Sequence, residues 1–378
     1  MGCCKSKSSV VEPLRYKVFA DRELDIERDS MEQSKRCYLI FVNPHSGPGK
    51  SLQVFRRILE PKLKAAGISY ELVITERANH ARAMMRTRNL DEFSAIVILS
   101  GDGLVFEVVN GMFERPDRDK ALRKPLGVVP SGSGNALIAS VFRHCNIPID
   151  KKSFIERSCE MIASPHLSVL PVNLFHVETP TEHFAGFLSV GWALMSDIDI
   201  ESEKWRKALG HARFTAGAVV RCFHLRTYKG RVSYLPANAK KAVPESSTSP
   251  NDVSLTKSTQ QSTTVIVDDE NSVRAKTSET TDWGAAWRKR YPEEGEFPAL
   301  SDPVPSSWTV MNEDFVLIHA ITMSHIGSNG PYMPCAQLDD DRIYLTYVTK
   351  RELSNRVSML KCLADIETSK HLDYDFLK

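Results

Sequence analysis

Apolar segments and helical patterns alternate along the first part of the chain, from Cys37 to about Ser140. Four short segments are apolar at nearly every position, which is typical of strands buried on both faces, and they cover residues 37–42, 70–74, 94–99 and 126–130. Between them, apolar residues recur at helical spacing, and the expected helices cover residues 50–66, 79–88, 105–113 and a stretch from Asn135. Strand–helix alternation predicts an α/β domain with a parallel sheet covered on both faces.

The pattern changes after about His166. Apolar runs now follow one another without a regular helix between each pair, which predicts an antiparallel sheet or sandwich. The expected strands are residues 166–178, 183–192, 230–237, 314–323 and 342–348, with two helical stretches at 203–225 and 351–371. The segment 237–305 is rich in Ser, Thr, Lys, Asp and Glu, and we expect a disordered insertion because it lacks apolar residues to bury.

These changes divide the chain into three parts. Residues 1–35 form a tail that we expect to be mostly disordered, residues 36–165 an α/β domain, and residues 166–378 a second, antiparallel domain with two helices. A length of 378 residues leaves room for two domains.

Composition and charge exclude several classes of protein. Hydrophobic residues make up 42% and charged residues 25%, as in ordinary globular proteins, and a net charge of +2 gives no basis for nucleic-acid binding through bulk charge. None of the eight cysteines forms a CxxC pair, so we expect reduced thiols in a cytoplasmic protein rather than a disulfide framework or a zinc site. No apolar run reaches about 18 residues, so no membrane-spanning helix is expected.

The N-terminal sequence MGCCKSK nevertheless points to a membrane surface. Gly2 follows the initiator Met, and Ser6 lies at the offset that N-myristoylation requires, while Cys3 and Cys4 are candidates for palmitoylation. Two acyl chains anchor a protein stably where one does not. We therefore expect a cytoplasmic protein held at the inner face of membranes such as the plasma membrane. The alternative is a disordered tail in which glycine and cysteine occur by chance.

Three glycine-rich turns carry the clearest chemical signal. They are NPHSGPGK at residues 43–50, SGDG at residues 100–103 and PSGSGNAL at residues 130–137. Glycine lets a ligand approach the backbone closely, so such turns at strand ends suggest a phosphate cradle made of backbone amides. Together with the loop that begins at Thr75, they follow four strands of the predicted parallel sheet and therefore meet at one edge. Asp102 lies between two glycines there and is placed to accept a proton.

Two further residues near these turns have open interpretations. The turn 43–50 differs from a GxxxxGK[ST] loop because its glycines lie two residues apart. Lys50 therefore either contacts a phosphate or is a solvated lysine at a helix start. Glu107 either holds Mg²⁺ or is only a favourable charge near a helix N-terminus. Since Mg²⁺ uses one or two carboxylates plus nucleotide phosphates, we expect no dedicated metal cage.

The acidic run DIDIESEKWRK, residues 197–207, follows a predicted strand directly. Its acids repel one another unless cations lie nearby, and a cationic substrate amine would supply one. Asp199 is therefore either an amine-binding carboxylate or only a helix N-cap. The segment 213–231 mixes apolar residues with arginine and lysine. It is either a helix with a solvated basic face or a segment that meets a membrane or calmodulin.

These motifs together resemble the sphingosine kinase family. The segments are NPHSGPGK, TERANHA, SGDGLVFEVVNG, PSGSGNAL, DIDIESEKWR and LRTYKGRVSYLP, in the order and at the spacing of that family, over residues 36–236 and 305–375. The first four are similar to all diacylglycerol-kinase-like lipid kinases, and the last two narrow the resemblance. It implies ATP-dependent phosphorylation of the primary hydroxyl of sphingosine or sphinganine. It also implies a phosphofructokinase-like N-terminal domain and a C-terminal antiparallel sandwich that binds lipid.

The resemblance also implies roles for individual residues. Asp102 matches the family's catalytic proton acceptor, and Ser100, Gly101, Gly103 and Ser189 match residues that contact substrate together with it. Asp199 matches the carboxylate that binds the sphingoid amine. The positions that match the family's ATP site are Asn43, Pro44, His45, Thr75, Glu76, Arg77, Ala78, Asn79, Glu107, Gly132, Ser133, Gly134, Arg206 and Arg213.

Two features depart from the family pattern. Members often carry Arg or another residue where His45 stands. The family also has further strands with an Asp-Gly-Glu sequence after the position of Lys378, and this chain stops there. We therefore expect a shortened form with an unstable fold or low activity. The alternatives are a catalytically impaired lipid-binding or regulatory protein, or a kinase for another lipid such as diacylglycerol or ceramide, against which an amine-binding Asp199 argues.

Overall fold

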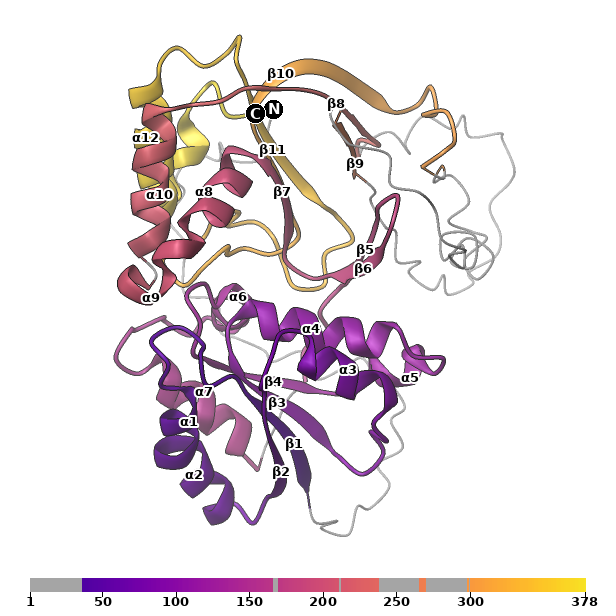
Figure 1. Ribbon diagram of the computed structural model, residues 1–378, viewed down its shortest axis with the longest axis vertical. Helices are drawn as coiled ribbons and strands as arrows, with labels where there is room; N and C mark the ends of the chain where they lie inside the picture. Colours follow the sequence, from indigo (N-terminus) through magenta and orange to yellow (C-terminus); the bar gives the residue numbers. More distant parts are fainter. Residues whose placement is uncertain (1–35, 166–168, 211, 238–264, 270–297, 299) are drawn as a thin grey trace, which may run out of the picture.

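The computed structural model describes residues 36–165, 169–210, 212–237, 265–269, 298 and 300–378. The expected acylation sites Gly2, Cys3 and Cys4 lie outside these residues, as does most of the segment 237–305. Figure 1 shows two domains stacked along the long axis of the molecule, an N-terminal α/β domain and a C-terminal antiparallel domain.

The N-terminal domain contains a four-stranded parallel sheet in the order β2-β1-β3-β4. The strands are β1 (Cys37–Val42), β2 (Ser69–Ile74), β3 (Ala95–Ser100) and β4 (Leu126–Pro130). Each differs from its predicted range by at most one residue at either end. The predicted parallel α/β sheet is thus confirmed. Because the chain reverses its winding direction between β1 and β3, the topological switch point lies at the carboxyl ends of these two strands.

Helices cover both faces of this sheet because side chains alternate along each strand. Leu39 and Phe41 of β1 pack in a core with α3 (His80–Thr87), α4 (Asp102–Phe113), α5 (Arg118–Ala121) and α6 (Ala136–His144). Tyr38 and Ile40 pack on the other face, against α1 (Ser51–Val54), the π-helical turn η1 (Phe55–Leu59), α2 (Glu60–Ala65) and α7 (Phe154–Ala163). The expected helix at 50–66 thus contains a π-helical turn, and α7 is a helix that the sequence pattern did not single out.

The C-terminal domain is built on a five-stranded antiparallel sheet. Its long strand β10 (Thr309–Ile321) pairs through its first half with β8 (Tyr228–Tyr234) and through its second half with β7 (Ser189–Ala193). On its other edge β10 pairs with β11 (Tyr344–Thr349). Strand β9 (Val265–Asp269) pairs with β8 and completes the sheet. A separate hairpin of β5 (Phe175–Glu178) and β6 (His183–Gly186) lies near the junction of the two domains (Figure 1).

The antiparallel architecture is confirmed, but three details differ from the predictions. Among the described residues the hairpin β5–β6 takes the place of a second full sheet, and residues 169–174 are not a strand. Residues 265–269, inside the segment expected to be disordered, form β9. Their sequence VIVDD starts with three β-branched residues, which favour an extended backbone. The expected helix start at 203 is also too late, because helix α8 begins at Leu194.

Helices pack on one side of the antiparallel sheet (Figure 1). They are α8 (Leu194–Ser202), the 3₁₀ turn η2 (Glu203–Trp205), α9 (Arg206–Leu209), α10 (Ala212–Phe223) and α12 (Arg356–Ala364), with the 3₁₀ turns η5 (Asp365–Thr368) and η6 (Lys370–Asp373) following. Leu194, Cys222, Leu317, Val348 and Met359 are at most 2% exposed and form the center of this core. Among the described residues, no helix combines the length and apolarity needed to cross a bilayer.

The buried strand β3 gives a test of the N-terminal core. Ile98 is fully buried in the layer between the sheet and helices α3 to α6. We expect Ile98→Ala to lower the free energy of unfolding by about 2–5 kcal/mol, because it removes buried methyl groups and leaves a cavity. Urea unfolding followed by circular dichroism measures this change. Val357→Ala, at an exposed position of α12, is the control and should change stability by no more than about 0.5 kcal/mol. Equal effects of the two changes would contradict the assigned core.

Candidate active site

The four polar loops singled out in the sequence follow β1, β2, β3 and β4 and meet at one edge of the sheet. The first loop is tied to the third strand, since Asn43 N–H donates to Leu99 C=O at 3.3 Å. The fourth is tied to it as well, since Ser131 N–H donates to Ser100 C=O at 3.1 Å. Two buried hydroxyls, Ser46 Oγ and Ser100 Oγ, lie 3.1 Å apart between the first and third loops. The convergence predicted for these loops is therefore present.

Glycines allow these loops to pack backbone against backbone. A Cβ atom at Gly47, where φ is +53°, would lie 2.5 Å from Ser131 C=O. A Cβ atom at Gly101 would lie 2.9 Å from Gly132 Cα. Any larger residue would separate the loops. The bare backbone that results is the surface a phosphate group requires for close approach to amides.

Asp102 is the first residue of α4, and its carboxylate lies at the N-terminus of a different helix, α6. Its Oδ2 accepts the Ala136 N–H at 2.9 Å and its Oδ1 accepts the Leu137 N–H at 3.1 Å. Burial raises the pKa of Asp102 above its ordinary value, while these two backbone N–H groups act in the opposite direction. The net effect is an upward shift of the pKa of Asp102, which is the direction that makes its carboxylate a stronger base.

Asn135 holds the fourth loop in shape. It has a left-handed backbone with φ of 59°, and its side chain makes two hydrogen bonds to Gly132. Oδ1 accepts the Gly132 N–H at 2.9 Å and Nδ2 donates to the Gly132 C=O at 3.0 Å. Asn tolerates this backbone conformation better than most residues, which explains the sequence GSGN before a helix. Asn135 was not among the residues that we selected from the sequence.

The remaining N-terminal candidates lie around this edge. Asn43 Oδ1 accepts the His45 N–H at 2.9 Å, which shapes the first loop as an Asx turn with Pro44 inside it. Thr75 is buried, its N–H donates to Val42 C=O at 2.9 Å, and the loop continues through Glu76, Arg77, Ala78 and Asn79 to α3. The fourth loop supplies Gly132, Ser133 and Gly134. A Cβ atom at Gly134 would lie 3.0 Å from Asp102 Oδ2.

Glu107 lies on α4, in the turn that follows Asp102. Its Oε2 atom is buried and has no hydrogen-bond partner among the described residues. A buried carboxylate oxygen without a partner is costly, so it fits a site that receives a cation. No group of three or more His, Cys, Asp or Glu side chains is placed to hold a metal within the described part of the chain. A divalent ion at Glu107 would therefore need oxygens from a nucleotide, as Mg²⁺ commonly does.

Asp199 lies inside α8, so the alternative that it is only an N-cap is wrong. Its Oδ1 pairs with Arg213 Nη2 at 2.7 Å, while 64% of the Asp199 side chain is exposed. Arg213 is 2% exposed and also contacts Glu203 Oε2 at 3.2 Å and Ser202 Oγ at 2.8 Å. The buried guanidinium supplies the positive charge that this acidic helix requires. It orients the Oδ1 oxygen of Asp199.

The other C-terminal candidates lie on α9 and β7. Arg206 begins α9 and pairs with Glu203 at 2.7 Å. Ser189 begins β7, beside Ile321 at the end of β10. The contacts of Arg206 and Arg213 described above are with α8 and η2, and none joins them to the glycine loops. Figure 1 shows α9 at the end of the C-terminal domain that faces the N-terminal domain. A nucleotide contact by either arginine stays a prediction.

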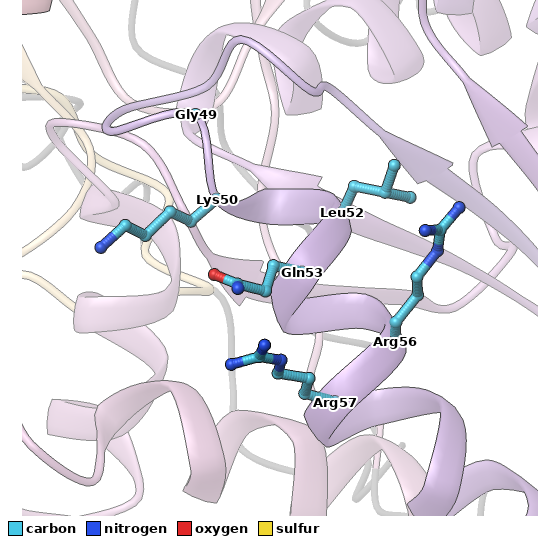
Figure 2. A pocket seen from close by; sticks show the side chains of 6 residues that line it. All are labelled: Gly49, Lys50, Leu52, Gln53, Arg56 and Arg57. Atoms are coloured by element: carbon cyan, nitrogen blue, oxygen red, sulfur yellow. The ribbon is translucent and has the colours of Figure 1, made fainter.

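A basic hollow lies beside the first loop, on the helix that follows it. It is lined by Gly49, Lys50, Leu52, Gln53, Arg56 and Arg57. Figure 2 shows Lys50, Gln53 and Arg57 along one side of the helix, with Leu52 and Arg56 directed to the other side. The cations of this hollow are Lys50, Arg56 and Arg57. No carboxylate of the described residues lies within ion-pair distance of them. Their charge is available to an anion, which leaves both interpretations of Lys50 open.

Comparisons with known proteins place this arrangement in a family. Residues 37–168 match the model of the diacylglycerol kinase catalytic domain. The chain is 40% identical over 354 residues to sphingosine kinase 1 of Caenorhabditis elegans, covering 92% of this chain and 73% of that protein. It is 35% identical over 339 residues to human sphingosine kinase 1, covering 89% and 78%.

Solved structures agree in fold. A diacylglycerol kinase from Bacillus anthracis str. Sterne gives a TM-score of 0.50 at 17% identity, covering 89% of this chain and 80% of that chain. A further structure from the same strain gives 0.53 at 16% identity, covering 91% and 83%. Identity this low supports the two-domain fold and nothing finer. The sequence similarity over both domains carries the stronger conclusion: this chain belongs to the sphingosine kinase family.

Proposed function

We propose that this protein is an ATP-dependent lipid kinase that transfers the γ-phosphate of ATP to the primary hydroxyl of sphingosine or sphinganine, giving the sphingoid base 1-phosphate. The observation that carries the proposal is the Asp102 carboxylate, which is buried at the convergence of the glycine loops. Family membership supports the substrate class. The largely exposed Asp199 carboxylate on α8 favours an aminated lipid over diacylglycerol or ceramide, whose head groups carry no positive charge.

The glycine loops supply the nucleotide site in this proposal. Phosphates approach the loop backbone at Gly47 and Gly134 in this proposal, because the N–H groups of Asn43, His45, Ser46 and Gly132 already donate within the protein. The cations beside the first loop offset the phosphate charge. Glu107 is the residue that fits Mg²⁺, because its Oε2 has no protein partner. Bound Mg²⁺ would neutralise negative charge on the phosphate oxygens. Lys50 and Arg57 add positive charge beside the first loop.

Asp102 acts as the general base. Its carboxylate accepts the proton of the lipid hydroxyl while that oxygen forms a bond to the γ-phosphorus. The bond between the γ-phosphorus and the bridging oxygen of ATP breaks, and ADP leaves with the electron pair of that bond. Most of the rate enhancement in such a transfer comes from position and electrostatics. The two α6 N–H groups fix the position of the Asp102 carboxylate before substrate arrives.

Asp199 binds the protonated amine of the sphingoid base in this proposal. Arg213 donates to Oδ1, so the carboxylate has a defined orientation. An ammonium at Oδ2 would make a charge-assisted hydrogen bond. Diacylglycerol offers no cation to that oxygen, so this contact discriminates between lipid classes.

Membrane attachment forms part of the same proposal, because the substrate is a lipid. The start MGCCKS supports myristoylation of Gly2 and palmitoylation of Cys3 and Cys4, which would hold the protein at the cytoplasmic face of membranes. Helix α10 adds a second contact surface, since Val219, Val220 and Phe223 are exposed on it. Such a surface is able to bind a bilayer, and calmodulin is the alternative partner for a basic amphipathic helix.

The role of Asp102 is tested by Asp102→Asn. The amide keeps the shape and one acceptor oxygen but does not take up the proton, so kcat for sphingosine should fall by about 10²-fold or more. ATP binding, followed by titration of the purified protein, should change little. Labelled ATP and sphingosine give the rate. A kcat within a few-fold of the original protein would assign the base to another residue.

The role of Asp199 is tested by Asp199→Asn. Loss of the negative charge should raise the KM for sphingosine by about 10- to 100-fold with a smaller change in kcat, because the amine is bound before and during the reaction. Glu203→Gln is the matched control, since Glu203 also pairs with Arg213. It should leave this KM within about twofold if Asp199 itself holds the amine. An equal rise of the KM for sphingosine in both variants would contradict amine binding by Asp199 and would assign the effect to the loss of an Arg213 ion pair.

The acyl anchor is tested by Gly2→Ala, which removes the myristoylation site. The protein should move to the soluble fraction after cell fractionation, because without the myristoyl chain the tail lacks the first membrane contact that brings Cys3 and Cys4 to acylation at the bilayer. Serine in place of Cys3 and Cys4 should have a similar effect. Activity in detergent micelles, which needs no anchor, should stay unchanged and serves as the control. Unchanged membrane recovery of all variants would contradict the proposed anchor.

A further inference from the structure

Helix α6 links the Asp102 carboxylate to the C-terminal domain. Its first two N–H groups, of Ala136 and Leu137, donate to Asp102. The same helix is contacted along its length by one segment of the other domain, residues 324–334, which we call the strap. The orientation of α6, and with it the position of the Asp102 carboxylate, therefore depends on both domains.

The strap contacts α6 at its start, middle and end. Ser328 N–H donates to the Gly134 C=O at 2.9 Å, directly before the helix. His325 N–H donates to Ser140 Oγ at 3.2 Å in the middle of the helix, where both residues are buried. At the last turn, Arg143 Nη2 donates to the Pro334 C=O at 3.0 Å. Three contacts spread along one helix fix its position and its tilt.

The strap itself is closed and anchored. A bridge joins His325 to Pro331, and Met333 N–H donates to the Ser324 C=O at 3.0 Å. The imidazole of His325 is buried, and its Nδ1 lies 2.9 Å from Ser324 Oγ. On the far side, Ser369 Oγ donates to the Pro331 C=O at 2.6 Å. The strap is thus held in one conformation by hydrogen bonds within itself and to Ser369.

We infer that the strap is a positioning element for the proposed catalytic base, with His325 and Ser328 as positioning residues that hold α6 against the Asp102 carboxylate. The inference rests on the proposed kinase function for its kinetic consequences. Neither residue touches the reacting atoms. They act through α6, whose N-terminal amides set both the geometry and the protonation of Asp102.

The sign of the expected pH effect follows from these contacts. Hydrogen bonds from N–H groups favour the ionised carboxylate, so a displaced α6 would raise the pKa of Asp102 further. The base then becomes ionised only at higher pH, and the acidic limb of the kcat profile moves upward. The titratable side chains on the surrounding elements are Glu107 on α4, Arg143 and His144 at the far end of α6, His325 on the strap and His45 on the first loop.

The first test compares two buried serines of the N-terminal domain. Ser140→Ala removes the acceptor of the His325 N–H and leaves that donor buried without a partner. Ser158→Ala is the matched control, because the Ser158 hydroxyl bonds only within its own helix, to the Phe154 C=O. We expect Ser140→Ala to lower kcat about 3- to 10-fold. The acidic limb of its kcat–pH profile should move to higher pH by about half a pH unit. The KM for sphingosine should stay constant, since Asp199 lies on α8.

The second test removes a single backbone donor. Ser328→Pro eliminates the N–H that holds the Gly134 C=O, while Ser328→Ala keeps it. The proline variant should show a larger shift of the acidic limb, about one pH unit, and the alanine variant should match the original protein. Where the proline variant does not fold by circular dichroism, the comparison of Ser140→Ala with Ser158→Ala decides the matter.

Hydrogen exchange separates this inference from the kinase proposal, because it needs no substrate. Amides of residues 136–140 on α6 should exchange faster in Ser140→Ala and in folded Ser328→Pro than in their controls, with exchange from the strands of the parallel sheet unchanged. Absence of sphingosine phosphorylation by the original protein would contradict the kinase proposal and leave this exchange test intact. Unchanged exchange on α6, or a lower kcat with an unmoved pH profile, would overturn the inference.

Discussion

The buried contact between Asp102 and the N-terminus of α6 is the interaction on which the site depends. Asp102 begins one helix and accepts N–H groups from the start of another, so the carboxylate joins the loops after β3 and β4. Burial alone would favour the neutral carboxyl group, whereas hydrogen bonds from the α6 amides favour the ionised carboxylate. The result is a carboxyl group whose position is fixed and whose pKa is raised above its ordinary value by burial, against the effect of the α6 amides.

The surrounding backbone has to come unusually close for this contact to form. Gly47, Gly101 and Gly132 let three loops touch without intervening side chains, and Gly134 leaves space next to Asp102 Oδ2. The same absence of side chains exposes amides to a phosphate-bearing ligand. A single requirement, close approach of backbone segments, thus explains both the packing of the loops and their proposed chemistry.

The two domains contribute differently to this arrangement. The parallel sheet places the loops, while the C-terminal domain holds them through buried polar contacts. Asn110 on α4 exchanges two hydrogen bonds with Ala185 of β6, at 2.9 and 3.1 Å. His325 and Ser328 contact α6. Asp199 and Arg213 form a separate buried-cation arrangement on the C-terminal helices.

The sequence by itself determined the parallel sheet, its strand ranges and the convergence of the four loops, because apolar runs and glycine turns are local signals. Those signals also singled out Asp102. Only the tertiary structure decided that Asp102 binds α6, that Asp199 lies inside a helix over a buried Arg213, and that the strap reaches α6. Each of these contacts joins residues that are distant in sequence or that belong to different secondary-structure elements. Residues 324 to 334 carry no motif, so their contact with Gly134 and Ser140 follows from the packing of one domain on the other.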